Sequence, residues 1–128
     1  MDYGSLPYRI REIDYFMELF KDWKTDIFEQ ANIVWIVQDK IRRTVEKIKE
    51  TKPKEFNKIS HGFDWALTKL DNSYKTIKNF SFYLRAHKPL EEFKSNLPSG
   101  KDYLRAYNNV LNALEVVRNL FTILDSSK

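Results

Sequence analysis

Residues 26–51 read DIFEQANIVWIVQDKIRRTVEKIKET, and this stretch is the strongest indication of the fold class. Its apolar positions recur on a seven-residue rhythm that Gln38 interrupts, and such a rhythm is typical of one face of an α-helix. These positions are Ile27, Ala31, Val34, Ile41, Val45 and Ile48. Either Thr25 or Asp26 is suited to cap the start of this helix. The helix ends near Thr51, because Pro53 cannot continue the hydrogen-bond ladder.

Helical spacing continues on both sides of this stretch. A first helix is predicted over about 8–23, and a last one over about 101–124. The apolar pattern of 54–86 fits one helix, or two if Asp71-Asn72-Ser73 marks a bend. Pro89 opens a short amphipathic segment through about Lys94. Four to five helices must then share one core, so the sequence predicts an all-α, single-domain bundle over residues 1–128.

Composition narrows the class of protein further. With 42% hydrophobic and 15% aromatic residues in 128, the chain is too rich in large side chains to be disordered. Cysteine is absent, which excludes disulfides and thiolate nucleophiles and makes the cytoplasm the expected location. No export signal and no window of 18 uncharged apolar residues is present, so we expect no membrane partner. The net charge of +4 favours anionic partners without requiring one.

Catalytic and metal-binding motifs are not recognisable in the sequence. The two histidines, His61 and His87, each lack a second histidine at the helical spacing that paired metal ligands use. We interpret His61 as a helix-surface residue beside Gly62, and His87 as a cap of the segment that Pro89 opens. Gly4, Gly62 and Gly100 are isolated, so no phosphate-binding glycine loop exists. We therefore expect no enzyme activity, no metal, no other cofactor and no small-molecule substrate.

Cationic residues form two groups. One surrounds Pro53 and consists of Arg42, Arg43, Lys47, Lys49, Lys52, Lys54 and Lys58. The other follows along the next helix and consists of Lys69, Lys75, Lys78, Arg85 and Lys88. Such a band is able to neutralise phosphates. Glutamates are interspersed in the first group, as on an ordinary soluble helix face, so nucleic-acid contact and a merely solvated surface both stay open.

An apolar run at residues 80–84, FSFYL, places large side chains all around a helix. This pattern indicates either deep burial or a face that a partner covers. The sequence therefore predicts a protein interface at Phe80, Phe82 and Tyr83.

Two segments of the chain carry a family resemblance. The first is HGFDWAL at residues 61–67. The second comprises Tyr103, Leu104, Arg105, Val110, Leu111, Ala113, Glu115 and Arg118. Over about residues 40–124 the chain resembles the small all-helical subunit of the type III-B (Cmr) CRISPR effector complex, an RNA-targeting antiviral defence assembly. Residues 1–39 would add an N-terminal helix and the start of the second helix.

That resemblance implies a non-catalytic subunit that stacks along a ribonucleoprotein filament and contacts the RNA backbone. Its expected partners are other protein subunits, further copies of itself, and RNA. The resemblance suggests Lys69, Arg105 and Arg118 as phosphate contacts, and the charge pattern adds Lys75, Lys78 and Arg85. The alternative is a protein-only helical adaptor or structural bundle without nucleic-acid contact. A DNA-binding regulator is disfavoured, since no helix-turn-helix pair is visible between about 99 and 124.

Overall fold

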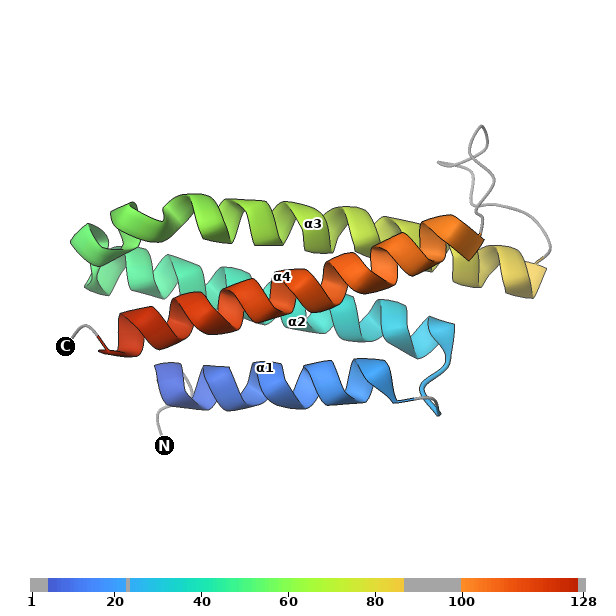
Figure 1. The fold of residues 1–128 in the computed structure, drawn as a ribbon, viewed down its shortest axis with the longest axis horizontal. Coiled ribbons are helices and arrows are strands. Elements are labelled where there is room, and N and C mark those ends of the chain that lie inside the picture. The colour runs from blue at the N-terminus through green and yellow to red at the C-terminus, as the bar shows by residue number, and fades with distance from the viewer. Residues whose placement is uncertain (1–4, 23, 87–99, 127–128) are drawn as a thin grey trace.

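The computed structural model describes residues 5–22, 24–86 and 100–126, and this part of the chain forms four helices. They are α1 (Leu6–Lys21), α2 (Ile27–Thr51), α3 (Pro53–Ala86) and α4 (Gly100–Ser126). Successive helices run in opposite directions (Figure 1). α3 packs extensively against α4 and α2, whereas α1 packs mainly against α4 and only lightly against α2. The predicted all-α, single-domain bundle is confirmed.

The turn between α1 and α2 uses both of the predicted capping candidates. The Asp26 carboxylate accepts a hydrogen bond from the Glu29 backbone N–H at 2.8 Å, so Asp26 caps the start of α2. Thr25 acts on the preceding helix, because its hydroxyl donates to the Leu19 carbonyl at 2.8 Å. One side chain therefore begins α2 while its neighbour satisfies the end of α1.

A single residue, Lys52, separates α2 from α3. Pro53 begins α3, where its missing N–H would have had no intrahelical partner. The Lys52 ammonium group donates to the Leu124 carbonyl at 3.1 Å and so connects this turn to the end of α4. Such a short connection makes α2 and α3 an antiparallel pair with a fixed register.

Residues 53–86 form one helix without the bend considered at 71–73. Ser73 in this region is buried at the helix interface. Gly62 lies inside α3, where a Cβ atom would come within 2.7 Å of the Leu120 Cδ1 atom, so its lack of a side chain lets α4 approach closely. The predicted segment from Pro89 to Lys94, and His87 before it, lie outside the described residues.

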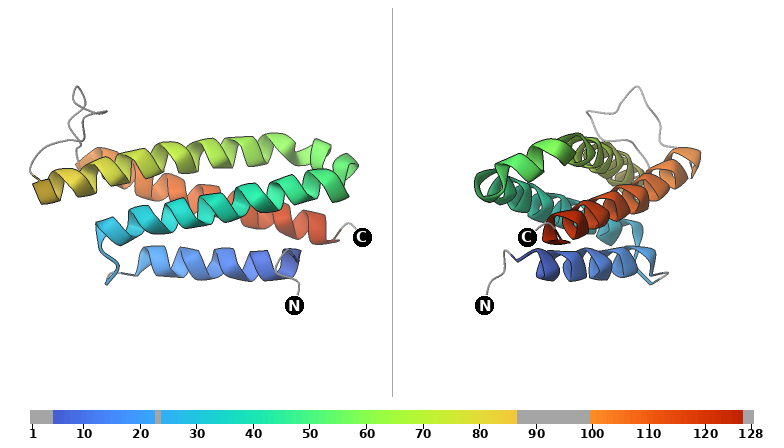
Figure 2. Two further views of the ribbon diagram at one scale, coloured as in Figure 1. Left: turned by 180° about the vertical axis from the view of Figure 1, so that it is seen from behind. Right: turned by 60° about the vertical axis from the view of Figure 1, so that its left-hand side comes forward.

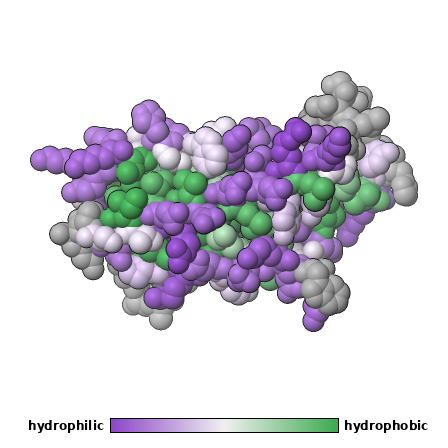
Figure 3. Space-filling model, viewed as in Figure 1, coloured by the Kyte–Doolittle hydropathy of each residue, from purple (hydrophilic) through white to green (hydrophobic). Residues whose placement is uncertain are grey.

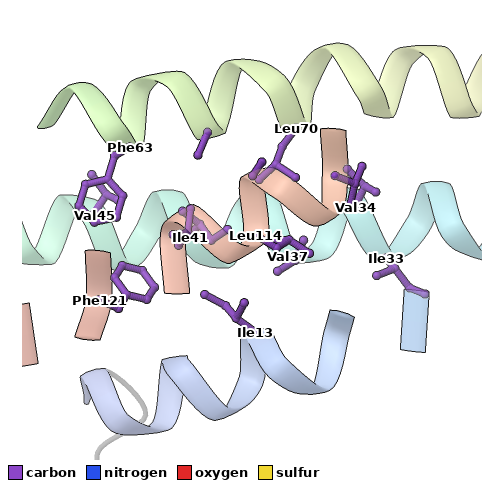
Figure 4. Close-up of a cluster of buried hydrophobic side chains, with 14 of the residues drawn as sticks. Ile13, Ile33, Val34, Val37, Ile41, Val45, Phe63, Leu70, Leu114 and Phe121 are labelled. Carbon is purple, nitrogen blue, oxygen red and sulfur yellow. The ribbon is translucent and has the colours of Figure 1, made fainter. Parts of the chain in front are cut away.

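The core runs along the whole bundle between the four helices (Figure 4). Phe63 and Leu70 of α3 point toward α2 and α4, and the Phe63 ring lies 5.5 Å from that of Phe121 on α4. α1 contributes Phe20, whose ring stacks on Tyr107 of α4 at 5.0 Å. Complete burial of a large apolar side chain stabilises a fold by roughly 1.5–3 kcal/mol, so these residues hold α1, α3 and α4 together.

The helices are amphipathic, with charged residues on their outer faces. Within the described ranges, none of them contains an apolar run long enough to cross a membrane.

Candidate nucleic-acid interface

Three of the six predicted phosphate contacts share one side of α3. Lys75, Lys78 and Arg85 are separated by three and seven residues, which places them close together around the helix at 100° per residue. Lys69 lies about 120° to 180° around the helix from them by the same geometry. The structure therefore separates Lys69 from the group in which the charge pattern had placed it.

Exposed aromatic rings of α2 lie next to these cations. The Trp35 ring of α2 lies 5.5 Å from the Tyr74 ring of α3. The Lys78 ammonium nitrogen lies 5.6 Å from the centre of the Tyr74 ring. We call the surface formed by Phe28, Trp35, Tyr74, Lys75, Lys78 and Arg85 the α2–α3 face. In the left view of Figure 2, the two helices that carry it lie side by side.

The closest contact between a cation and a ring on this face joins its two helices at one end. The Arg85 guanidinium carbon lies 4.2 Å from the centre of the Phe28 ring, which is a stacking distance for a cation over an aromatic ring. Phe28 remains exposed despite this contact. Among the described residues, no salt bridge pairs Lys78 or Arg85 with a carboxylate, so both keep their charge available to an anionic ligand.

Asp71 partly neutralises the third cation of the face. Its carboxylate lies 3.2 Å from the Lys75 ammonium nitrogen and accepts a hydrogen bond from the buried Gln38 amide at 3.4 Å. Burial raises the pKa of Asp71, but the hydrogen bonds from Lys75 and Gln38 and the charges of Lys75 and Arg42 outweigh it. The net pKa lies below the ordinary value of 3.8, so Asp71 is anionic at neutral pH and offsets Lys75.

The other three predicted contacts do not join the α2–α3 face. Lys69 lies 5.9 Å from the centre of the Trp65 ring on another side of α3. Arg118 of α4 donates to the Asp14 carboxylate of α1 at 2.6 Å, so it connects two helices of the bundle. Arg105 is exposed on α4. The six cations predicted as one set therefore form one group of three and three separate positions.

The cations around Pro53 concentrate the positive excess of the chain at one end of the bundle. Residues 42–58 contain seven Lys or Arg and three Glu, an excess of four that equals the net charge of the whole chain. Several of these side chains have local partners, since Lys52 bonds to Leu124 and Lys49 lies 3.6 Å from Glu46. This end is mixed in sign, as the sequence indicated.

The residues of the predicted protein interface do not all share one side of α3, because Phe82 lies about 160° around the helix from Phe80, whereas Tyr83 lies about 60° from it. The Phe80 ring stacks on Tyr103 of α4 at 5.5 Å, so it belongs to the packing between α3 and α4. Phe82 and Tyr83 are half-buried. A partner surface at these three residues stays a prediction.

Three large apolar side chains of α3 and α4 are exposed at separate positions. Apolar side chains interrupt the polar surface along these two helices in Figure 3. Leu104 and Ile123 of α4 are 59% and 53% exposed, and Trp65 of α3 is 44% exposed. Side chains of this size at such exposure are typical of surfaces that a partner covers, although single ones occur on any protein.

The sequence reasoning missed the three aromatic residues of the α2–α3 face, which are Tyr74 on α3 and Phe28 and Trp35 on α2. Phe28 and Trp35 lie seven residues apart on α2, roughly 100° around the helix from the middle of the apolar stripe that predicted its core face. Large aromatic residues at heptad spacing outside the core stripe were the available signal. The cations of this face lie on α3, and the sequence pattern alone did not show that α3 packs beside the aromatic residues of α2.

No family model matches the chain, and neither a curated protein nor a solved structure matches it at a significant level. The resemblance to the small subunit of the type III-B CRISPR complex therefore stays a prediction. Within the described residues, no group of three His, Asp or Glu side chains has the arrangement of a metal site.

Proposed function

We propose that this chain is a non-catalytic subunit of a ribonucleoprotein complex that contacts RNA through the α2–α3 face. Its role would be similar to that of the small subunit of the type III-B CRISPR complex, beside other protein subunits in the cytoplasm. The observation that carries the proposal is that Lys75, Lys78 and Arg85 lie on one surface with the exposed rings of Phe28 and Trp35. Cations beside aromatic rings fit a polymer that offers both phosphates and base faces.

Two ionisable side chains of the described residues have pKa values shifted from their ordinary ones. Asp71 has a pKa lowered from 3.8. Burial raises the pKa of Tyr103 above its ordinary 10.0, and the nearby Tyr107 adds to this rise while a hydrogen bond to Gln30 opposes it. The proposal assigns the chain no catalytic step, no cofactor and no small-molecule substrate.

The alternative is a protein-only adaptor that uses exposed apolar side chains of α3 and α4. The exposure of Leu104, Ile123 and Trp65 favours it, because covering such side chains removes apolar area from water. The two functions differ in their response to salt. Phosphate contacts weaken as salt rises, whereas burial of apolar surface does not.

The proposal is tested by fluorescence anisotropy with a labelled single-stranded RNA at about 50 mM salt, where phosphate contacts are strong. Three forms of the full chain are compared. The first is the unchanged chain, the second carries Lys75→Gln, Lys78→Gln and Arg85→Gln, and the third carries Lys69→Gln, Arg105→Gln and Arg118→Gln. Both triple variants lose three positive charges, so a difference between them reports position and not net charge.

We expect the unchanged chain and the Lys69, Arg105, Arg118 variant to bind RNA, and the Lys75, Lys78, Arg85 variant to lose most of its affinity. Circular dichroism and thermal unfolding test whether both variants keep their fold, because Arg118→Gln also removes the bond to Asp14. If the unchanged chain does not bind RNA, or if both variants lose affinity equally, RNA contact through the α2–α3 face is wrong.

A further inference from the structure

Trp35 lies at the centre of the α2–α3 face and presents an unusually large apolar ring to water. It is 52% exposed, and the neighbouring Tyr74 ring contacts it at an interplanar angle of 40°. This tilt means that Tyr74 supports the indole without covering it as a parallel stack would. Much of the Trp35 ring is therefore available to another flat ring.

Positions along α2 extend this surface in both directions. Phe28, Trp35 and Arg42 follow one another at seven-residue intervals and so lie on one line along the helix, about 10.5 Å apart at 1.5 Å per residue. Lys78 and Arg85 border the same line from α3, through their contacts with Tyr74 and Phe28. The exposed rings of Phe28 and Trp35 therefore have cations of α3 beside them, and Arg42 follows them along α2.

We propose that Trp35 is a base-stacking platform that makes the α2–α3 face selective for single-stranded RNA over duplex RNA. This inference rests on the proposed function, because it names the form of RNA that the same surface binds. Base faces are free to stack on an aromatic side chain in a single strand, whereas in a duplex they are covered by their neighbours.

Charge complementarity favours a polynucleotide over a protein as the occupant of this surface. An apolar protein surface laid on Trp35 would remove Lys78 and Arg85 from water without neutralising them, and burying an unpaired charge is costly. A strand whose bases stack on Trp35 brings phosphates within reach of the same two cations. The ligand that satisfies both the ring and the cations is therefore an anionic chain that carries flat rings.

The test compares a labelled single-stranded RNA with a duplex of the same sequence, using the full chain and the variants Trp35→Ala and Trp65→Ala. Trp65 is the matched control, because it is also a half-exposed indole with a lysine nearby, at 44% exposure and with Lys69 at 5.9 Å, but it lies outside the α2–α3 face. Stacking of one base on an aromatic side chain contributes about 1–3 kcal/mol, so Trp35→Ala should weaken single-strand binding about 5- to 150-fold. Trp65→Ala should leave it unchanged.

A third variant, Trp35→Phe, keeps an aromatic ring at this position and should retain most of the single-strand affinity. Thermal unfolding of each variant shows whether a loss of binding comes from a loss of structure. If the chain binds RNA but Trp35→Ala and Trp65→Ala bind equally well, or if Trp35→Ala weakens duplex binding as much as single-strand binding, the stacking role is wrong while the proposed function stands. If the unchanged chain binds neither RNA, both proposals are wrong.

Discussion

The number of cations on the α2–α3 face predicts how steeply the affinity for RNA falls as the salt concentration rises. Single-stranded nucleic acids release counterions on binding, so the logarithm of the affinity falls with the logarithm of salt with a slope of about −0.7 for each phosphate neutralised. Lys78 and Arg85 each count as one contact, and Lys75 counts as less than one because Asp71 lies 3.2 Å from its ammonium nitrogen. Two to three contacts give a slope of about −1.4 to −2.1.

Between about 50 and 200 mM salt, this slope lowers the affinity roughly 7- to 18-fold. The assay is a series of anisotropy titrations with a labelled single-stranded RNA at four or five salt concentrations. The same titrations with the Lys75, Lys78, Arg85 triple glutamine variant should give a slope close to zero, and those with the Lys69, Arg105, Arg118 variant should keep the slope of the unchanged chain.

Two results would refute this reasoning. A flat salt dependence for the unchanged chain would mean that phosphates are not neutralised. A slope steeper than about −4 that survives in the Lys75, Lys78, Arg85 variant would mean that six or so other cations make the contacts. The cations around Pro53 would then be the binding surface, since residues 42–58 hold the whole positive excess of the chain.

Three further predictions concern the bundle itself. Glu12→Gln should lower the free energy of unfolding in urea by roughly 1–3 kcal/mol. The reason is that the Glu12 side chain is only 15% exposed and its carboxylate forms a salt bridge with the Arg9 guanidinium at 2.6 Å. An unchanged free energy of unfolding would show that this salt bridge does not stabilise the fold. Tyr103→Phe should cost about 1–3 kcal/mol at neutral pH, because it leaves the buried Gln30 carbonyl oxygen without the hydroxyl that donates to it at 2.5 Å. Since the folded-state pKa of Tyr103 is raised above its ordinary 10.0, this stabilisation is present below pH 10 and is lost as pH rises further. Denaturation curves above pH 10 should therefore converge for the two proteins, and parallel curves would contradict the shift. Phe121→Ala should lower the free energy of unfolding, measured by thermal unfolding, by about 3–5 kcal/mol, because the Phe121 ring is fully buried between helices. A decrease of less than about 1 kcal/mol would contradict the packing of α4 described above.

The sequence predicted the ends of helices where neighbouring residues determine them, through capping side chains or proline. Asp26 begins α2 through its own hydrogen bond to Glu29, and Pro53 begins α3 at the place its chemistry required. Whether residues 54–86 form one helix or two could not be decided from neighbouring residues in the sequence. It depended on Gly62 fitting against Leu120 of α4 and on the burial of Ser73, and both are properties of the assembled bundle.

The positions of the six predicted cations were likewise predictable from the sequence only in part. Helical periodicity within α3 already groups Lys75, Lys78 and Arg85 and separates Lys69, so that part of the grouping was present in the sequence. The ion pair between Arg118 and Asp14 was not, because it joins α4 to α1 across 104 positions of the chain. A list of positive residues does not say which of them already have partners.

The aromatic half of the site depends on the register between α2 and α3. Because only Lys52 separates these helices, they must run antiparallel to each other, but Trp35 lies 17 residues before Lys52 and Tyr74 lies 22 residues after it, so the turn alone does not pair these two rings. The side on which the two helices meet follows from Gln38, which interrupted the apolar rhythm of α2. Its side chain is completely buried and donates to Asp71 of α3, so the interruption marks the part of α2 that faces α3. A polar residue in the core stripe therefore indicated a polar partner on a neighbouring helix, but its identity as Asp71 and the offset between α2 and α3 are properties of the assembled bundle, so the sequence did not place Trp35 beside the α3 cations.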